Sequence, residues 1–120
     1  MNLYESSEDY LETILMIKEE KGFVRSIDIA EHLNFSKPSV SVAMKKLHEA
    51  GYITIAKNGH IDLTKSGLEV ANKIYDRHKV LTNLFVELGV PYEIAEKDAC
   101  RIEHDLSEET YQAIKNKFSK

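Results

Sequence analysis

Residues 53–63 read ITIAKNGHIDL, and this stretch decides the fold. Isoleucine and leucine alternate with polar residues on both sides of Asn58-Gly59, which is the pattern of two half-buried β-strands. An Asn-Gly pair supplies the positive φ values that a type I′ turn needs. The stretch therefore predicts a short β-hairpin.

Helical spacing of apolar residues predicts three helices before the hairpin, covering about residues 8–20, 26–34 and 38–51. Ser6 or Ser7 can cap the first helix and Ser26 the second, while Pro38 suits the first turn of the third. Three helices followed by a hairpin form the order of a winged helix-turn-helix domain. In such a domain the third helix enters the major groove of DNA and the hairpin flanks it as a wing.

Three further helices are predicted after the hairpin, over about residues 65–88, 91–106 and 107–118. Pro91 opens the second of these and Ser107 caps the last. They carry more apolar surface than a DNA-reading domain needs, so we expect a self-association surface. The predicted fold class is mainly α, with a winged helix domain over residues 1–70 and a helical dimerisation domain over residues 71–120.

The composition is that of a soluble cytoplasmic protein, with 42% hydrophobic and 30% charged residues in a chain of 120. No apolar run approaches the roughly 18 residues of a membrane span. The N-terminus lacks the pattern of a secretory signal, and the single cysteine cannot form an internal disulfide. The net charge of −4 argues mildly against a nucleic-acid partner, so local density of basic residues matters more.

The outward face of the third predicted helix is the candidate DNA-reading surface, because Val40, Met44 and Leu47 form its inward stripe. Pro38 and Val42 can contact thymine methyl groups. The full predicted set, which adds serines for phosphate contacts and lysines for charge, is Ser36, Lys37, Pro38, Ser39, Val42, Lys45 and Lys46 with Lys57 of the wing. Solvated lysines are common on any helix, and some winged helices bind only proteins.

A second candidate site lies in the predicted helix over residues 91–106. Four residues fall on one face at i, i+4, i+7 and i+8, namely Glu96, Cys100, Glu103 and His104. Two carboxylates beside a thiolate repel one another, and a divalent cation removes that penalty. Asp9 and Glu12 one turn apart, and His78, can complete one or two metal sites. Taken alone, a cysteine such as Cys100 is more often a small buried residue than a metal ligand.

Several segments resemble the diphtheria toxin repressor and manganese transport regulator family. They are DYLE at residues 9–12, SKPSVS at 36–41, Arg77-His78, and ACRIEH at 99–104. The resemblance covers nearly the whole chain in order. It implies a metal bound between the first helix and the dimerisation helices, which favours a dimer that places two recognition helices on a palindromic operator.

The resemblance implies two ligand sets. A main site uses Asp9, Cys100, Glu103 and His104, and a neighbouring site uses Glu12, His78 and Glu103 with Glu96 close by. The iron-sensing branch has methionine where this chain has Asp9 and glutamate where Thr82 stands, and its chains carry an SH3-like third domain. The manganese-sensing branch has glutamate at Cys100, so the set is a hybrid. Mn²⁺ or Fe²⁺ is expected, with Zn²⁺ or Co²⁺ possible.

The predicted function is that of a metal-dependent DNA-binding transcriptional regulator. We expect a homodimer that represses metal-uptake genes and that becomes active when it binds Mn²⁺ or Fe²⁺. We expect no enzyme, no small organic substrate and no membrane partner. The main alternative keeps the DNA reader and makes Cys100 a redox sensor, although Glu103 nearby disfavours a low pKa for its thiol. A metallo-hydrolase and a protein-binding module without DNA are further alternatives.

Overall fold

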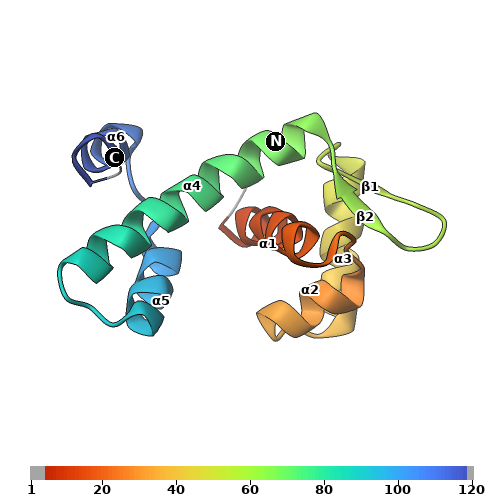
Figure 1. Ribbon diagram of the computed structural model, residues 1–120. Helices are drawn as coiled ribbons and strands as arrows, with labels where there is room; N and C mark the ends of the chain where they lie inside the picture. The colour runs from red at the N-terminus through yellow and green to blue at the C-terminus, as the bar shows by residue number, and fades with distance from the viewer. Residues whose placement is uncertain (1–4, 119–120) are drawn as a thin grey trace. The chain divides into compact units, whose positions relative to one another are not determined.

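The computed structural model describes residues 5–118, and the chain divides into two compact units, Met1–Asn72 and Lys73–Lys120. Six helices and one hairpin follow one another along the described residues (Figure 1). They are α1 (Glu5–Lys21), α2 (Ser26–Leu33), α3 (Lys37–Glu49), β1 (Ile53–Ile55), β2 (Ile61–Leu63), α4 (Lys65–Glu87), α5 (Tyr92–Ile102) and α6 (Glu108–Phe118). The predicted fold class, mainly α with a winged helix, is confirmed.

The N-terminal unit buries the apolar stripe of α3, which packs against α2 and β1. Val40, Met44 and Leu47 are at most 2% exposed, as their spacing predicted. Ser36 caps α3, because its Oγ accepts a hydrogen bond of 3.3 Å from the Ser39 amide. The other buried apolar residues of α1, of the segment between α1 and α2, of α2 and of the hairpin are Tyr10, Leu11, Ile14, Leu15, Ile17, Val24, Ile29, Ala30, Ile53 and Ile61.

Two predicted helix starts are wrong. The helix α1 already includes Glu5, so Ser6 and Ser7 lie inside it and cap nothing. The N-cap of α2 is Arg25, not Ser26. The Asp28 carboxylate accepts hydrogen bonds from the Arg25 amide at 3.0 Å and from Lys21 Nζ at 2.9 Å. The Lys21 hydrogen bond is the main reason that the pKa of Asp28 lies below its ordinary value.

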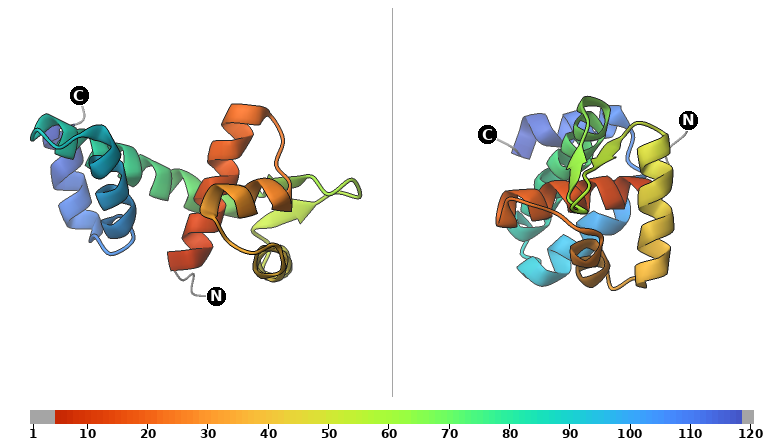
Figure 2. Two further views of the ribbon diagram at one scale, coloured as in Figure 1. Left: turned by 90° about the horizontal axis from the view of Figure 1, so that it is seen from below. Right: turned by 90° about the vertical axis from the view of Figure 1, so that its right-hand side faces the viewer.

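The hairpin pairs β1 and β2 antiparallel, with Ile53 opposite Leu63, and Figure 2 shows it extending away from α1, α2 and α3. Its turn is not type I′ as predicted, because Asn58 does not have a positive φ. The Gly59 amide donates to the Ala56 carbonyl, and Gly59 itself has φ of 88°. This is a type I turn closed by a left-handed glycine. The Ile61 amide donates to the Val24 carbonyl at 2.8 Å, which ties the wing to the segment before α2.

The first turn of α4 packs tightly on the end of α3 and the start of the wing. Thr64 Oγ1 accepts a hydrogen bond from the Gly67 amide and donates one to the Gly51 carbonyl. A Cβ at Gly67 would lie 2.0 Å from the Tyr52 carbonyl oxygen, a backbone atom that cannot move independently. Only glycine allows this approach.

We expect Gly67→Ala to destabilise the N-terminal unit by roughly 3 kcal/mol, because the added methyl group forces α4 and Tyr52 apart. Urea unfolding followed by circular dichroism measures this change. Ser66→Ala is the matched control, since Ser66 is the exposed preceding residue of the same helical turn, and it should change stability by less than about 0.5 kcal/mol. Equal stabilities of the two variants would contradict the close packing.

The C-terminal unit packs the later part of α4 against α5 and α6. Its buried apolar residues are Ile74, Val80, Leu81, Ala95, Ala99 and Tyr111. Ser107 caps α6 as predicted, because its Oγ accepts from the Thr110 amide at 3.1 Å. None of the helices described is long and apolar enough to cross a membrane.

The predicted helix over residues 91–106 ends early. The helix α5 stops at Ile102, which is 40% exposed, and Glu103 is its C-cap. Glu103 keeps helical φ and ψ and its amide donates to the Ala99 carbonyl, so it still lies on the face of Glu96 and Cys100, whereas His104 lies in the turn that follows. At this end of the helix the buried Arg77 guanidinium, from α4, donates to the carbonyls of Glu103 and Leu106.

Candidate metal centre and DNA-reading face

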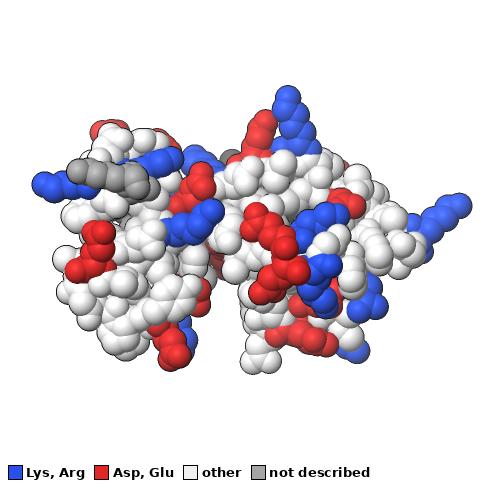
Figure 3. All heavy atoms as spheres, in the orientation of Figure 1, with Lys and Arg blue, Asp and Glu red and all other residues white. Residues whose placement is uncertain are grey.

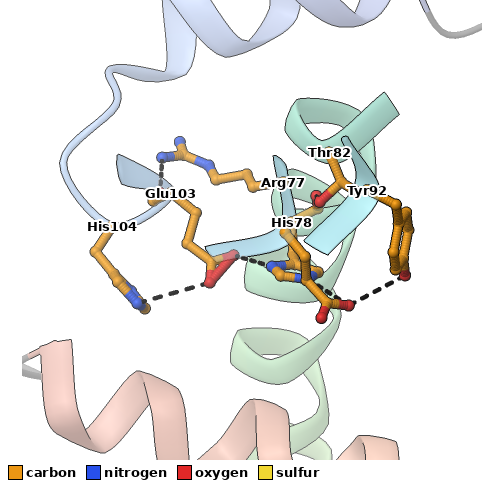
Figure 4. Close-up of polar contacts among 7 residues, drawn as sticks. Arg77, His78, Thr82, Tyr92, Glu103 and His104 are labelled. Carbon is orange, nitrogen blue, oxygen red and sulfur yellow. Dashed lines mark hydrogen bonds and ion pairs between the residues drawn. The ribbon is translucent and has the colours of Figure 1, made fainter. Parts of the chain in front are cut away.

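Glu103 lies at the centre of the candidate metal centre. Its side chain is fully buried, and neither carboxylate oxygen makes a hydrogen bond with any part of residues 5–118. Figure 4 shows it between two imidazoles. Its Oε2 is 3.3 Å from His78 Nδ1 and its Oε1 is 3.8 Å from His104 Nε2. The side chains of His78 and His104 are themselves only 12% and 3% exposed.

This arrangement fits a divalent cation. A buried carboxylate is costly unless it is paired with charge, bonded to donors or bound to a metal. Here Glu103 has two imidazoles at contact distance and no hydrogen bond from the described residues, so its oxygens keep their capacity to bind an ion. Carboxylate oxygen and imidazole nitrogen are both ligands of first-row transition metals.

Two more predicted ligands lie in the same unit. Cys100 is exposed, and its Sγ is within 4.8 Å of a Glu103 carboxylate oxygen. Glu96 Oε2 lies 3.8 Å from His78 Nε2 and accepts a hydrogen bond of 3.1 Å from the Tyr92 hydroxyl. That hydrogen bond is the main reason that the pKa of Tyr92 is raised. The C-terminal unit thus groups oxygen, nitrogen and sulfur donors.

The two other predicted ligands are on α1, in the N-terminal unit. Asp9 is half-buried, and Glu12, one turn later, is only 5% exposed. Burial of a carboxylate on a helix otherwise lined by apolar residues is unusual without a functional or structural reason. Asp9 and Glu12 remain predicted ligands.

Sequence reasoning named Arg77 in the family resemblance but assigned no role to this buried residue. Its side chain is 5% exposed and meets the backbone of Glu103, as Figure 4 shows. A signal was present, because Arg77 has helical spacing from the buried Ile74 and Leu81 and so interrupts an apolar stripe. A charged residue at such a position indicates internal partners.

The predicted DNA-reading residues of α3 point away from the core of the N-terminal unit. Seven of the eight residues lie on or just before α3, all eight are exposed, and Val42 is 56% exposed. A groove of about 460 Å³ runs beside this face and is lined by Ser39, Val42 and Lys46 on one side and by Ser7 and Tyr10 on the other. An exposed face with a neighbouring groove is compatible with docking into the major groove of DNA.

Charges on the N-terminal unit are mixed. Figure 3 shows basic and acidic side chains intermingled over it on the face in view, with a basic side chain at the end of the hairpin. Sequence reasoning missed a group beside the wing, where the rings of Phe23 and His60 stack at 5.2 Å. Lys21 Nζ and Arg25 Cζ lie 5.4 and 5.5 Å from the Phe23 ring. These cations add positive charge near the wing.

A winged helix unit joined to a helical unit with clustered oxygen, nitrogen and sulfur donors defines a class, the metal-dependent DNA-binding regulators. Two family models match consecutive parts of the chain. Residues 2–61 match the N-terminal DNA-binding domain of the iron dependent repressors, and residues 64–120 match their metal binding and dimerisation domain. The chain therefore belongs to the iron dependent repressor family.

Curated relatives and solved structures agree with this assignment. The chain is 40% identical over 113 residues to an uncharacterised HTH-type transcriptional regulator of Methanocaldococcus jannaschii, a match that covers 92% of this chain and 90% of the relative. It is 36% identical over 108 residues to the transcriptional regulator MntR of Escherichia coli, covering 90% of this chain and 70% of MntR.

A solved manganese-dependent transcriptional repressor in complex with manganese superposes with a TM-score of 0.85 at 29% identity. The match covers 93% of this chain and 52% of that one, so the chain spans about half the length of the solved repressor. The comparisons make this chain a metal-dependent transcriptional regulator with DNA-binding and dimerisation domains, and they give no support to redox sensing by Cys100.

Proposed function

We propose that the chain is a homodimeric, metal-activated repressor of metal-uptake genes in the cytoplasm, without enzymatic activity or an organic substrate. It would bind palindromic operator DNA more tightly when Mn²⁺ or Fe²⁺ is bound. The observation that carries the proposal is the buried Glu103 carboxylate, which has two imidazoles beside it and no hydrogen bond among residues 5–118.

The proposed ligands fall into two sets that share Glu103. The main site takes Asp9, Cys100, Glu103 and His104, and the neighbouring site takes Glu12, His78 and Glu103, with Glu96 near His78. The contacts within the C-terminal unit support both sets, and the family resemblance supplies Asp9 and Glu12. A metal held by ligands from both units would restrict how the DNA reader moves relative to the dimerisation unit.

The donor set favours Mn²⁺ or Fe²⁺ where carboxylates dominate, whereas the thiol and the imidazoles also suit Zn²⁺ and Co²⁺. The matched family is described as iron dependent, and the solved relative contains manganese. We propose Mn²⁺ or Fe²⁺ as the activating ion.

Exposed apolar residues of the C-terminal unit support dimerisation. Five large hydrophobic residues are at least 40% exposed there, namely Val86, Leu88, Tyr92, Ile94 and Ile102. Apolar residues gathered on a small unit are typical of a self-association surface. We propose that this unit, beginning near residue 71, forms the dimer, and that the unit over residues 1–70 reads DNA.

We propose that the outward face of α3 and the wing contact DNA. The residues are Ser36, Lys37, Pro38, Ser39, Val42, Lys45, Lys46 and Lys57. Ser36 Oγ accepts from the Ser39 amide and bonds the Ser39 Oγ, and we propose that these two serines contact phosphate at the N-terminus of α3. Pro38 and Val42 present apolar surface for thymine methyl groups.

Metal titration with and without operator tests the proposed function. A duplex selected from random sequence in the presence of Mn²⁺ serves as operator. Linkage requires that operator raise Mn²⁺ affinity by the factor by which Mn²⁺ raises operator affinity, typically about 5- to 150-fold. Equal Mn²⁺ affinity in both conditions would show that the metal is not a switch.

A further inference from the structure

Arg77 joins three segments of the C-terminal unit through one buried side chain. Its Nη1 donates to the carbonyl oxygens of Glu103 at 3.1 Å and Leu106 at 2.5 Å. Its Nη2 lies 3.6 Å from the Glu108 carboxylate, and its guanidinium lies 5.1 Å from the centre of the Tyr111 ring. The end of α5, the following loop and α6 all therefore contact one residue of α4.

The same short segment of α4 also contacts the side-chain carboxylate of Glu103. His78 follows Arg77 directly, and its Nδ1 faces the Glu103 carboxylate at 3.3 Å, while Arg77 holds the Glu103 carbonyl. One residue of α4 thus bonds the backbone of this candidate ligand, and the next residue faces its side chain. Burial of a guanidinium is costly, so its hydrogen bonds must be retained for the unit to keep this arrangement.

We propose that Arg77 is a positioning residue for the metal centre. It fixes the turn that carries Glu103 and His104 relative to His78, and it connects α6 to that turn. This inference rests on the proposed metal-binding function. Groups that orient metal ligands from behind typically change metal affinity about 10- to 100-fold when they are replaced.

The test compares Arg77→Lys with the natural chain. Lysine keeps the charge but loses the planar group that reaches both carbonyls. We expect Arg77→Lys to weaken Mn²⁺ binding about 10- to 100-fold, measured from the electron paramagnetic resonance signal of free Mn²⁺. We also expect an altered Co²⁺ absorption spectrum, because the ligand geometry changes. Both are measured at a temperature where circular dichroism shows the variant folded.

Glu108→Gln is the matched control. It removes the charged partner of Arg77 and leaves both carbonyl hydrogen bonds in place, so Mn²⁺ affinity should stay within about threefold of the natural value. Natural affinity and spectrum in folded Arg77→Lys would overturn the inference while leaving the proposed function intact. If the natural chain itself binds neither Mn²⁺ nor Fe²⁺, the proposed function fails and the inference with it.

A second measurement needs no variant, and it tests the positioning role of Arg77 even if Arg77→Lys does not fold. Amide hydrogen exchange of the natural chain is followed by mass spectrometry with and without Mn²⁺. We expect the metal to slow exchange from Glu103 through the loop to Tyr111, because Arg77 ties these backbone segments together. Protection that stops at His104 would overturn the inference.

Discussion

Glu103→Gln should weaken Mn²⁺ binding by roughly 100-fold or more, beyond the usual effect of replacing a group that only orients a ligand. Glu103 is the residue shared by both proposed ligand sets, and its carboxylate supplies negative charge in a fully buried position. The amide keeps the shape but loses the charge that attracts the cation. The metal-free variant should remain folded, because it no longer buries a charge without hydrogen bonds from the described residues.

Competition with a fluorescent chelator measures the Mn²⁺ affinity, and thermal unfolding checks the fold of the metal-free protein. Glu93→Gln is the matched control, since Glu93 is an exposed carboxylate on the same helix, and natural affinity is expected for it. If Glu103→Gln bound Mn²⁺ as tightly as the natural chain, the proposed metal centre at Glu103 would be wrong.

A double variant, Lys45→Gln with Lys46→Gln, should weaken binding to a random-sequence duplex by about 60-fold at 0.1 M salt. Each lysine that neutralises a phosphate contributes about 0.9 to the slope of log affinity against log salt, so the slope should decrease by about 1.8. A random duplex isolates this charge effect from base recognition.

The measurement is a salt titration of duplex binding in the presence of Mn²⁺. Lys97→Gln, which removes an exposed lysine of α5, is the control and should leave the slope unchanged. If the double variant keeps the natural slope, α3 does not face the phosphate backbone and the DNA-reading surface lies elsewhere.

Much of the fold was predictable because its signals are local. Apolar spacing places the buried stripe of α3, and the glycine at residue 59 with flanking alternation places the hairpin. The errors are also local in origin. The Asp28 carboxylate accepts a hydrogen bond from the Arg25 amide, so the N-cap of α2 is Arg25 and not Ser26. In the hairpin turn only Gly59 has a positive φ, whereas the prediction required a positive φ at Asn58 as well. Short polar residues allow several cap and turn geometries, which the sequence pattern does not distinguish.

The site was less predictable, because contacts far apart in sequence build it. Helical spacing predicted that Cys100, Glu103 and His104 lie on one continuous helix face, and the structure keeps Cys100 and Glu103 close together. Glu103 still has helical geometry, but the helix ends there and His104 lies in the turn beyond, where Arg77 donates to carbonyls 26 and 29 residues later in the chain. Periodicity describes neighbours within about two turns and has no information on such contacts.

The end of α5 at Ile102 has an electrostatic consequence of its own. Aligned peptide dipoles give the last turn of a helix a partial negative charge equivalent to about half an elementary charge. The buried carboxylate thus stands where the backbone already creates a negative potential. The Arg77 guanidinium, which donates to the Glu103 carbonyl at 3.1 Å, offsets part of this potential, and a divalent cation held by Glu103 would offset the rest.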